Sequence, residues 1–296
     1  MKITKVLKFI ANHPLNRDQK IKSIIRFVKW QIGSRLIQGS VVVDWINGSK
    51  FLVRRGETGL TGNIYTGLHE FTDMSYLLHV LRSEDLFVDI GANVGSYSIL
   101  ACSAVGAEGI AFEPVPSTFD KLIDNMRVNR IEGRVECINE GVGATRGELK
   151  FTSGKDTMNH ALAEGEHCGE AIAVKVCTLD DKLTNRSPGI IKIDVEGFET
   201  PVLDGAASIL QSKNLHSVIM ELNGSGEHYG FDENEILKRM GEYGFETYSY
   251  DPFTRKLKSL EGKNQSSGNT IFIRNKKLVE ERLENSKSFT VLGKQV

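Results

Sequence analysis

The chain has 296 residues, a formal net charge of −1 and 40 % hydrophobic residues, which suits one large α/β core with an appendage or two domains at most. It has no run of roughly 18 apolar residues that could span a membrane, no signal-peptide pattern, and four cysteines whose spacing fits neither a zinc site nor a small disulfide framework. We therefore expect a reduced, cytoplasmic protein.

The N-terminal segment is strongly basic. Residues 1–38 contain nine lysines and arginines but a single acid, Asp18. Apolar residues recur at helical spacing on both sides of Pro14, which predicts two short amphipathic helices. Helices of this kind bind anionic membranes or, more often, pack on their own domain. Peripheral membrane contact therefore stays open as an alternative.

A hairpin and a helix are predicted between this segment and the core. Residues 41–53 contain two β-rich runs around Asn47 and Gly48, a sequence typical of hairpin turns. A helix over residues 69–81 then leads into the first core strand. We expect residues 1–80 to form an extension that serves as a lid or as one wall of a ligand cleft.

The intervening residues 56–67 are polar and contain four glycines. Tyr65 and Glu70 are the residues of this region that we expect to face the cleft, with a structural role as an equal alternative.

The most informative stretch is residues 86–98, LFVDIGANVGSYS, which joins a buried strand to a turn and a helix. Gly91 and Gly95 allow the backbone to turn tightly beside a ligand. Asn93 replaces the middle glycine of the dinucleotide fingerprint, so a bound pyrophosphate is disfavoured. The pattern with Asp89 at the strand end favours a nucleoside-type ligand such as S-adenosylmethionine.

A second strand ends in a carboxylate. Residues 109–114, GIAFEP, place Glu113 about 20 residues beyond the loop, where a ribose-binding acid is expected. A carboxylate can accept hydrogen bonds from both ribose hydroxyls. After a core helix over residues 116–129, a third strand ends at Asn139 and Glu140, either of which would accept from an adenine amino group.

Residues 147–176 predict a hairpin around a polar segment that contains His160 and His167. Such an insertion beside the binding edge of a sheet would shape an acceptor pocket, although segments of this composition are more often solvated turns.

The next strand, in IIKIDVEGFETPVL over residues 190–203, ends at Asp194 and Glu196. Carboxylates at the exit of a buried strand need hydrogen-bond or charge partners, so a purely packing role is disfavoured. A fifth strand over residues 217–222 has Glu221 at its exit. A helix over residues 233–240 and two late strands, expected as an antiparallel hairpin at one edge, complete the set.

Three motifs, DIGANVG, FEPVPSTFDKLIDN and IKIDVEGFETPVLDGA, resemble in order and spacing those of the FkbM-type S-adenosylmethionine-dependent methyltransferases. The resemblance covers residues 70–274. It implies a class I (Rossmann-like) α/β methyltransferase fold, with a seven-stranded, mostly parallel sheet whose last strand is inserted antiparallel. From the two late strands, we expect the antiparallel strand at an edge of the sheet. The catalytic domain would span residues 81–275, followed by a polar tail over residues 276–296. The implied activity is O-methylation of a sugar, a glycan or another small metabolite.

The resemblance also assigns residues to the cofactor. Those of the first loop would hold its methionine part, Glu113 its ribose, and Asp194 would lie beside its sulfonium, while Glu140 matches less clearly. The expected cofactor-binding residues are Asp89, Gly91, Asn93, Gly95, Tyr97, Ser98, Glu113, Glu140 and Asp194.

An alcohol acceptor loses a proton during methyl transfer, so the site needs a base or a metal. Asp194 and Glu196 are the first candidates for the base, since partial burial raises a carboxylate pKa toward neutrality. His160 and His228 are the second candidates. A metal site built from Asp194, Glu196 and Glu221 is an alternative, but we assign no metal.

Three competing functions remain. A nicotinamide-dependent oxidoreductase is disfavoured by the turn sequence, and a non-catalytic nucleoside-binding scaffold by the presence of all three motifs. A nucleic-acid methyltransferase would show a basic face or an aromatic motif for a flipped base, and the catalytic portion shows neither. We therefore expect a small-molecule or glycan acceptor and no nucleic acid.

Overall fold

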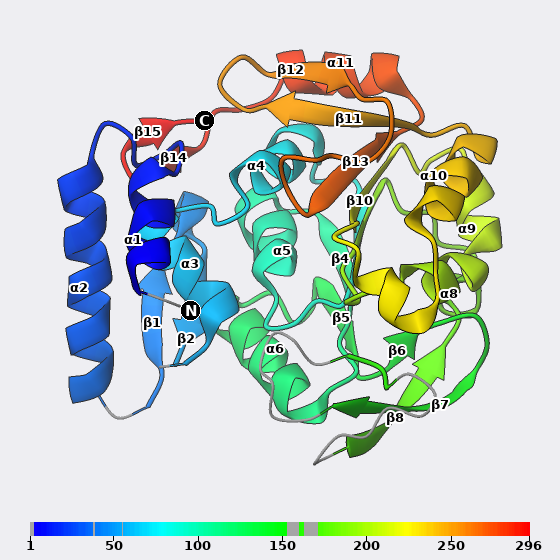
Figure 1. Ribbon diagram of the computed structural model, residues 1–296, viewed down its shortest axis with the longest axis horizontal. Coiled ribbons are helices and arrows are strands. Elements are labelled where there is room, and N and C mark those ends of the chain that lie inside the picture. Colours follow the sequence, from blue (N-terminus) through cyan, green and yellow to red (C-terminus); the bar gives the residue numbers. More distant parts are fainter. Residues whose placement is uncertain (1–2, 38, 55, 153–159, 163–170) are drawn as a thin grey trace.

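The computed structural model describes residues 3–37, 39–54, 56–152, 160–162 and 171–296. A central sheet carries helices on both faces, with α4, α5 and α6 on one side and α8, α9 and α10 on the other (Figure 1). The N-terminal helices lie beside the first of these layers. Among the described residues, no helix is long and apolar enough to cross a membrane.

The sheet has eight strands in the order β12-β11-β13-β10-β9-β3-β4-β5. Their bounds are β3 Leu86–Ile90, β4 Glu108–Phe112, β5 Val135–Ile138, β9 Ile190–Ile193, β10 Ser217–Glu221, β11 Glu246–Asp251, β12 Lys256–Ser259 and β13 Asn269–Ile273. Five neighbouring strands of this order, β10, β9, β3, β4 and β5, are parallel. β13 is antiparallel to both of its neighbours. The predicted mostly parallel class I sheet is confirmed.

Two details of the sheet differ from the expectation. The antiparallel β13 lies inside the sheet, between β10 and β11, and β12 adds an eighth strand that occupies the edge. All five residues of β13 are buried, which an edge position would not provide. An interior position therefore suits the apolar sequence NTIFI better than an edge does.

The strand order changes direction at β3: β4 and β5 lie on one side of it, and β9 and β10 lie on the other. β3 and β9 are parallel neighbours, with Ile90 opposite Ile193, so Gly91 and Asp194 leave the sheet side by side. In open α/β sheets, ligands bind at this kind of switch point, beyond the carboxyl ends of the strands. The fold thus brings the first and third sequence motifs together.

The helices that flank the sheet include the four predicted ones, after the first loop and over residues 69–81, 116–129 and 233–240, and three short ones between residues 179 and 211 that were not predicted. They are α4 Phe71–Val80, α5 Ser96–Ile99 with the π-helical turn η2 Leu100–Val105, α6 Pro116–Asn129, α7 Leu179–Lys182, α8 Glu199–Asp204, α9 Ala207–Gln211 and α10 Glu233–Glu242. The hairpin of β7 Gly147–Thr152 and β8 Ala171–Cys177 is also confirmed, and β6 Gly141–Val142 pairs with it. His167 lies outside the described residues.

The N-terminal extension contains α1 Ile3–Asn12, α2 Lys20–Leu36 and the hairpin β1 Val41–Asp44 and β2 Lys50–Val53. Asn47 and Gly48 adopt the left-handed conformation, at φ 52° and 82°, as the turn prediction requires. The polar, glycine-bearing residues 56–67, for which no element is predicted, form mostly helix α3, Thr58–Thr66. Burial of Leu60 and Tyr65 outweighs the low helix propensity of its glycines.

Residues 276–296 are not a polar tail. They form α11 Lys276–Glu284 and the hairpin β14 Thr290–Val291 and β15 Lys294–Gln295. Their apolar residues are few, which lowers the average hydropathy, but five are buried in the structure: Val279, Leu283, Phe289, Val291 and Val296. Arg282 of α11 also forms an ion pair with Asp85, at 2.5 Å, which fastens the helix to the start of β3.

Candidate active site

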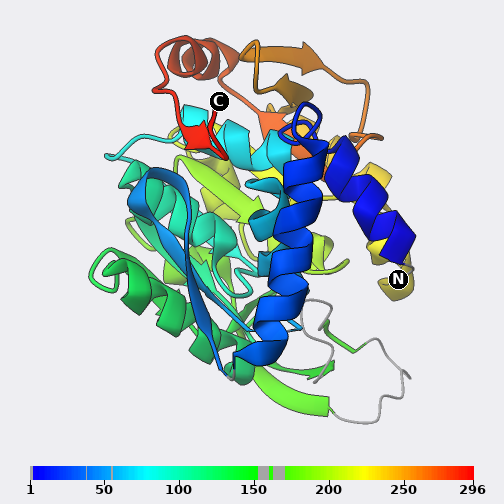
Figure 2. The same cartoon turned by 90° about the vertical axis from the view of Figure 1, so that its left-hand side faces the viewer.

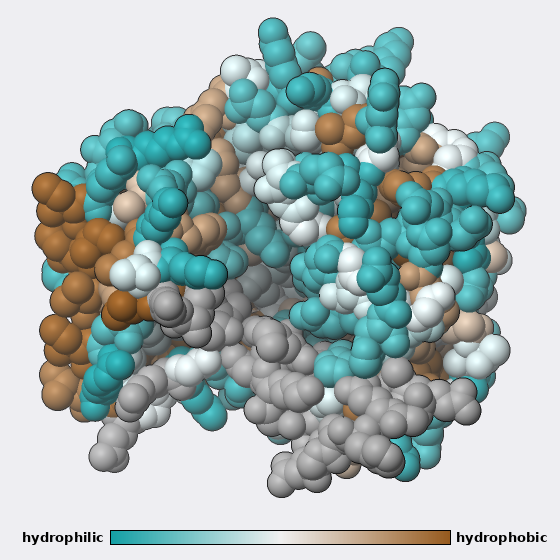
Figure 3. All heavy atoms as spheres, viewed as in Figure 1, coloured by the Kyte–Doolittle hydropathy of each residue, from teal (hydrophilic) through white to brown (hydrophobic). Residues whose placement is uncertain are grey.

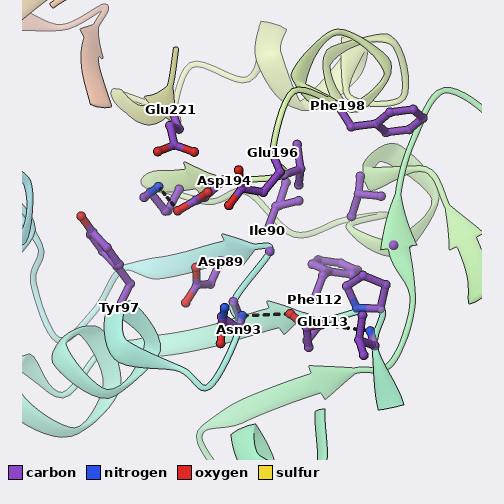
Figure 4. A pocket seen from close by; sticks show the side chains of 18 of the residues that line it. Asp89, Ile90, Asn93, Tyr97, Phe112, Glu113, Asp194, Glu196, Phe198 and Glu221 are labelled. Carbon is purple, nitrogen blue, oxygen red and sulfur yellow. Dashed lines mark hydrogen bonds and ion pairs between the residues drawn. The ribbon is translucent and has the colours of Figure 1, made fainter. Parts of the chain in front are cut away.

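A cavity of about 340 Å³ lies beyond the carboxyl ends of β3, β4, β9 and β10. The loop after β3 forms one side, and the turn after β9 forms the opposite side (Figure 4). The N-terminal extension adds His69, Glu70 and Met74 to the lining. The expectation that Glu70 faces the cleft is confirmed, whereas the buried Tyr65 accepts a hydrogen bond from Gln31 under α2.

The two glycines of the first loop are required by packing within the protein. A Cβ at Gly91 would lie 1.8 Å from the carbonyl oxygen of Asp194, and one at Gly95 would lie 2.7 Å from Leu122 of α6. Both residues have positive φ, 77° and 91°. Gly91 lines the cavity and Gly95 does not. Gly95 therefore lets α6 approach the loop and is not placed to contact a ligand.

Asp89 and Ser98 form a buried pair behind this loop. The hydroxyl of Ser98 donates to Asp89 Oδ2 at 2.6 Å, and Asp89 is buried. Burial raises the pKa of Asp89 to about 6. Asp89 lines the cavity, but Ser98 does not. Ser98 therefore orients a cavity carboxylate instead of contacting a ligand itself.

Glu113 joins the loops after β3 and β4. Its two oxygens accept from the backbone N–H of Asn93, at 3.0 Å, and of Val115, at 2.9 Å. Asn93 adopts the left-handed conformation, φ 52°, and its Oδ1 accepts from the N–H of Val94. Burial raises the pKa of Glu113 to about 7. Each carboxylate oxygen keeps further acceptor capacity for a ribose hydroxyl.

Lys192 is a site residue that the sequence prediction missed. Its side chain is 1 % exposed, and Nζ lies 3.1 Å from both Asp194 Oδ2 and Asn269 Oδ1. The ammonium also lies 5.3 Å from the centre of the Tyr97 ring. Burial alone lowers the pKa of Lys192, but nearby carboxylates outweigh it and raise the pKa above its usual value. A single lysine within the apolar run IIKI was the available signal.

Three carboxylates crowd together beside Lys192. One oxygen from each of Asp194, Glu196 and Glu221 lies within 4.8 Å of the others (Figure 4). Burial, followed by repulsion from Asp194, raises the pKa of Glu221 to about 9 and also raises the pKa of Glu196. At neutral pH this group therefore retains at least one proton. The three oxygens could also hold a divalent cation, next to which Lys192 would be a repulsive charge.

A tight turn aims Glu196 into the cavity. Glu196 and Gly197 both have positive φ, 53° and 99°, and a Cβ at Gly197 would lie 2.6 Å from the backbone of Ser225. Positive φ is uncommon for a residue other than glycine and is concentrated at functional sites. The turn thus has no room for a side chain at residue 197 and presents the preceding carboxylate to the cavity.

The other predicted residues contribute less directly. Tyr97 lines the cavity and donates to Glu70 Oε2 at 2.5 Å. Glu140 also lines it, but its carboxylate pairs with Lys182 at 2.8 Å. Asn139 donates to two backbone carbonyls after β4 and does not line the cavity.

The two histidines proposed as alternative bases lie outside the cavity lining. Their rings are 5.8 Å apart in an edge-to-face arrangement, and His228 is exposed. His160 is near enough to Glu196 for its charge to lower the pKa of that carboxyl. His160 therefore influences a base candidate more readily than it reaches a ligand.

The described lining of the cavity is strongly acidic, with Lys192 as its single lysine or arginine and seven carboxylates: Glu70, Asp89, Glu113, Glu140, Asp194, Glu196 and Glu221. This charge suits a cationic ligand such as a sulfonium and repels phosphates.

Comparisons with known proteins identify the family of the chain. Residues 89–247 match the family described as Methyltransferase FkbM domain. The chain is 31 % identical over 172 residues to the hexuronic acid methyltransferase AglP of Haloferax volcanii, a match covering 56 % of this chain and 65 % of that protein. It is 32 % identical over 169 residues to the 31-O-demethyl-FK506 methyltransferase FkbM of Streptomyces tacrolimicus, covering 46 % and 65 %.

The matches thus span less than two thirds of the length of these relatives. Among solved structures, TYW2 of Pyrococcus horikoshii in complex with MeSAdo aligns with a TM-score of 0.40 and 17 % identity, over 85 % of this chain and 81 % of that one. The family match covers more than half of the chain and includes all three motifs. The chain belongs to the FkbM family of methyltransferases, whose cofactor is S-adenosylmethionine.

Proposed function

We propose that the chain transfers a methyl group from S-adenosylmethionine to a hydroxyl of a sugar or another small metabolite. The observation that carries this proposal is the position of Glu196. It faces the cavity at the switch point, opposite the loop that would hold the cofactor, and burial raises its pKa above the usual value. A carboxylate with this environment is suited to accept a proton from an attacking hydroxyl.

The residues of the first two motifs fit the cofactor. Glu113 would hold the ribose hydroxyls, and the loop at residues 91–93, beside Asp89, would hold the methionine part. When bound, the cofactor supplies a methyl group already activated by a positively charged sulfur. The acidic lining stabilises that charge, and the enclosing walls position the acceptor and exclude water.

Two carboxylates that follow β9, Asp194 and Glu196, would have different roles. Asp194 is fixed by Lys192, so it suits orientation of a cationic or hydrogen-bonding group. Glu196 would take the proton of the acceptor hydroxyl on its carboxylate oxygen as the new oxygen–carbon bond forms and the sulfur–carbon bond to the methyl group breaks, which leaves S-adenosylhomocysteine. Two relatives support a small acceptor, because their names specify a hexuronic acid and an FK506 precursor as substrates.

The test is transfer from S-adenosylmethionine labelled with carbon-13 in its methyl group to a panel of sugars, uronic acids and polyols, followed by NMR. A new ether O-methyl resonance in one product supports the proposal. A methyl ester or N-methyl resonance would contradict the hydroxyl acceptor and indicate a carboxylate or an amine instead. Cofactor binding without transfer to any panel member would favour a non-catalytic scaffold, and binding of NADH instead would favour an oxidoreductase.

A chelator separates this mechanism from a metal-dependent one. Since Lys192 places a positive charge against Asp194, we expect activity in EDTA to stay within about twofold of that with added magnesium. A loss of about tenfold or more in EDTA, restored by magnesium, would assign the three carboxylates to a cation instead.

A further inference from the structure

The outer face of α2 carries a stripe of apolar side chains exposed to solvent. Ile21, Ile32 and Leu36 are 78 %, 56 % and 78 % exposed, and Ile25 and Val28 are exposed as well. On a helix of 3.6 residues per turn, these five lie within about 80° of one another. The stripe is the apolar margin in Figure 3, and Figure 2 shows α2 in front of the rest of the molecule.

Packing fixes this orientation of α2. On the opposite face, the ring of Phe27 lies 5.2 Å from that of Tyr65, and Arg26 donates to Asn16 Oδ1 at 2.6 Å. Ser23 and Ser34 are buried on the same side. The helix thus turns Ile24 and small, polar and aromatic residues inward and its other aliphatic residues outward, the reverse of a helix that only covers its own core.

Basic residues border the apolar stripe on both sides. Helical spacing places Lys22 and Lys29 along one edge, and Lys20 and Arg35 along the other. The sequence of α2 contains no aspartate or glutamate. Within the part of the chain that the structure describes, no carboxylate forms an ion pair with the three lysines. Their charges are therefore available to an external partner.

We propose that this face of α2 docks on an anionic lipid surface. An aliphatic stripe bordered by lysines is the arrangement with which helices lie in the interface of a membrane, where apolar side chains enter the acyl boundary and ammonium groups meet lipid phosphates. A second copy of the chain fits less well, because two such faces would bring eight like charges together without an acid on either helix. This inference does not depend on the proposed methyl transfer.

The test is co-sedimentation of the full chain with phosphatidylcholine vesicles, with and without phosphatidylserine. We expect pelleting only with phosphatidylserine, and release at high salt. The triple variant Lys20→Glu, Lys22→Glu and Lys29→Glu should lose at least about tenfold in partitioning. The matched control Lys213→Glu, Lys256→Glu and Lys258→Glu makes the same charge change at exposed lysines elsewhere and should stay within about twofold.

A second variant tests the apolar stripe. Ile21→Gln with Leu36→Gln replaces exposed side chains only, so its thermal unfolding should match that of the wild type, while binding to phosphatidylserine vesicles falls about tenfold or more. Recovery of the wild type in the supernatant with both vesicle types would overturn the proposal. So would equal loss of binding in both lysine variants, or a solution dimer that Leu36→Gln dissociates.

Discussion

The two sides of the cavity hold their carboxylates in different ways. At the ends of β3 and β4, Asp89 and Glu113 accept hydrogen bonds from a hydroxyl and two backbone N–H groups. At the exit of β9, Asp194, Glu196 and Glu221 crowd together beside one ammonium. Fixed donors make the first side a rigid receptor. On the second side, burial and the neighbouring carboxylates raise the pKa of Glu196 and of Glu221, so this side can take up and release a proton near neutral pH.

The largest expected effect comes from the crowded side. Glu196→Gln removes the base while keeping the size and polarity of the side chain, so we expect kcat to fall about 100-fold to 1000-fold. The affinity for S-adenosylmethionine should stay within about threefold. Initial rates and calorimetry measure the two quantities. Glu227→Gln, at an exposed residue outside the cavity lining, serves as the control.

On the fixed side the effect should be on binding. Glu113→Ala removes the ribose acceptor and leaves the N–H groups of Asn93 and Val115 without their partner. A charged hydrogen bond contributes about 1.5–3 kcal/mol, which corresponds to a loss in cofactor affinity of roughly 10-fold to 100-fold. The matched change at the exposed Glu132 should leave calorimetric binding unaltered.

Lys192 links the two sides, because its ammonium contacts both Asp194 and the ring of Tyr97. Lys192→Met leaves the nearby carboxylates without their cation, so unfolding free energy at neutral pH should fall by about 3 kcal/mol. Since protonation removes the uncompensated charge, the loss should shrink in mildly acidic buffer. Chemical denaturation at two pH values measures this, and an equal loss at both would contradict the assigned pairing.

The last expected effect is a pH dependence of stability without ligand. Burial raises the pKa of Glu221 to about 9, of Glu113 to about 7 and of Asp89 to about 6. A carboxyl with a raised pKa binds protons more tightly in the folded state, so stability falls as pH rises from the unfolded pKa, about 4.5, through the folded one. The melting temperature should therefore decrease between pH 6 and pH 9.

A variant tests whether the carboxylates at the ends of β9 and β10 cause this decrease of the melting temperature with pH. Glu221→Gln keeps the hydrogen-bonding shape and removes the titration, so it should flatten the decrease above about pH 7. An unchanged slope in this variant would mean that other groups carry the pH dependence.

Much of this site could be predicted from local sequence. Asp89 lies near the end of an apolar strand, Glu113, Asp194 and Glu196 follow such strands, and parallel strands bring their carboxyl ends to one edge of the sheet. The left-handed turn at Asn47 and Gly48 could also be predicted, because an Asn-Gly pair between two β-rich runs favours that geometry.

The remainder depends on contacts between distant residues. The burial of Lys192 rests on Asn269, 77 residues away, and the need for glycine at residue 95 arises from Leu122 of α6. Neither partner can be identified from periodicity. The same holds for the C-terminal residues, whose sparse apolar side chains are buried within the large hydrophobic core cluster.

The central claim is that the side at the ends of β3 and β4 binds the cofactor and the side at the exit of β9 accepts the proton. It is tested most directly by calorimetric titration of S-adenosylmethionine into the wild type, Glu113→Ala and Glu196→Gln. We predict equal affinity for the wild type and Glu196→Gln, with clearly weaker binding by Glu113→Ala. Equal affinity for the wild type and Glu113→Ala, or weakened binding by Glu196→Gln alone, would contradict the assignment of the cofactor to the ends of β3 and β4.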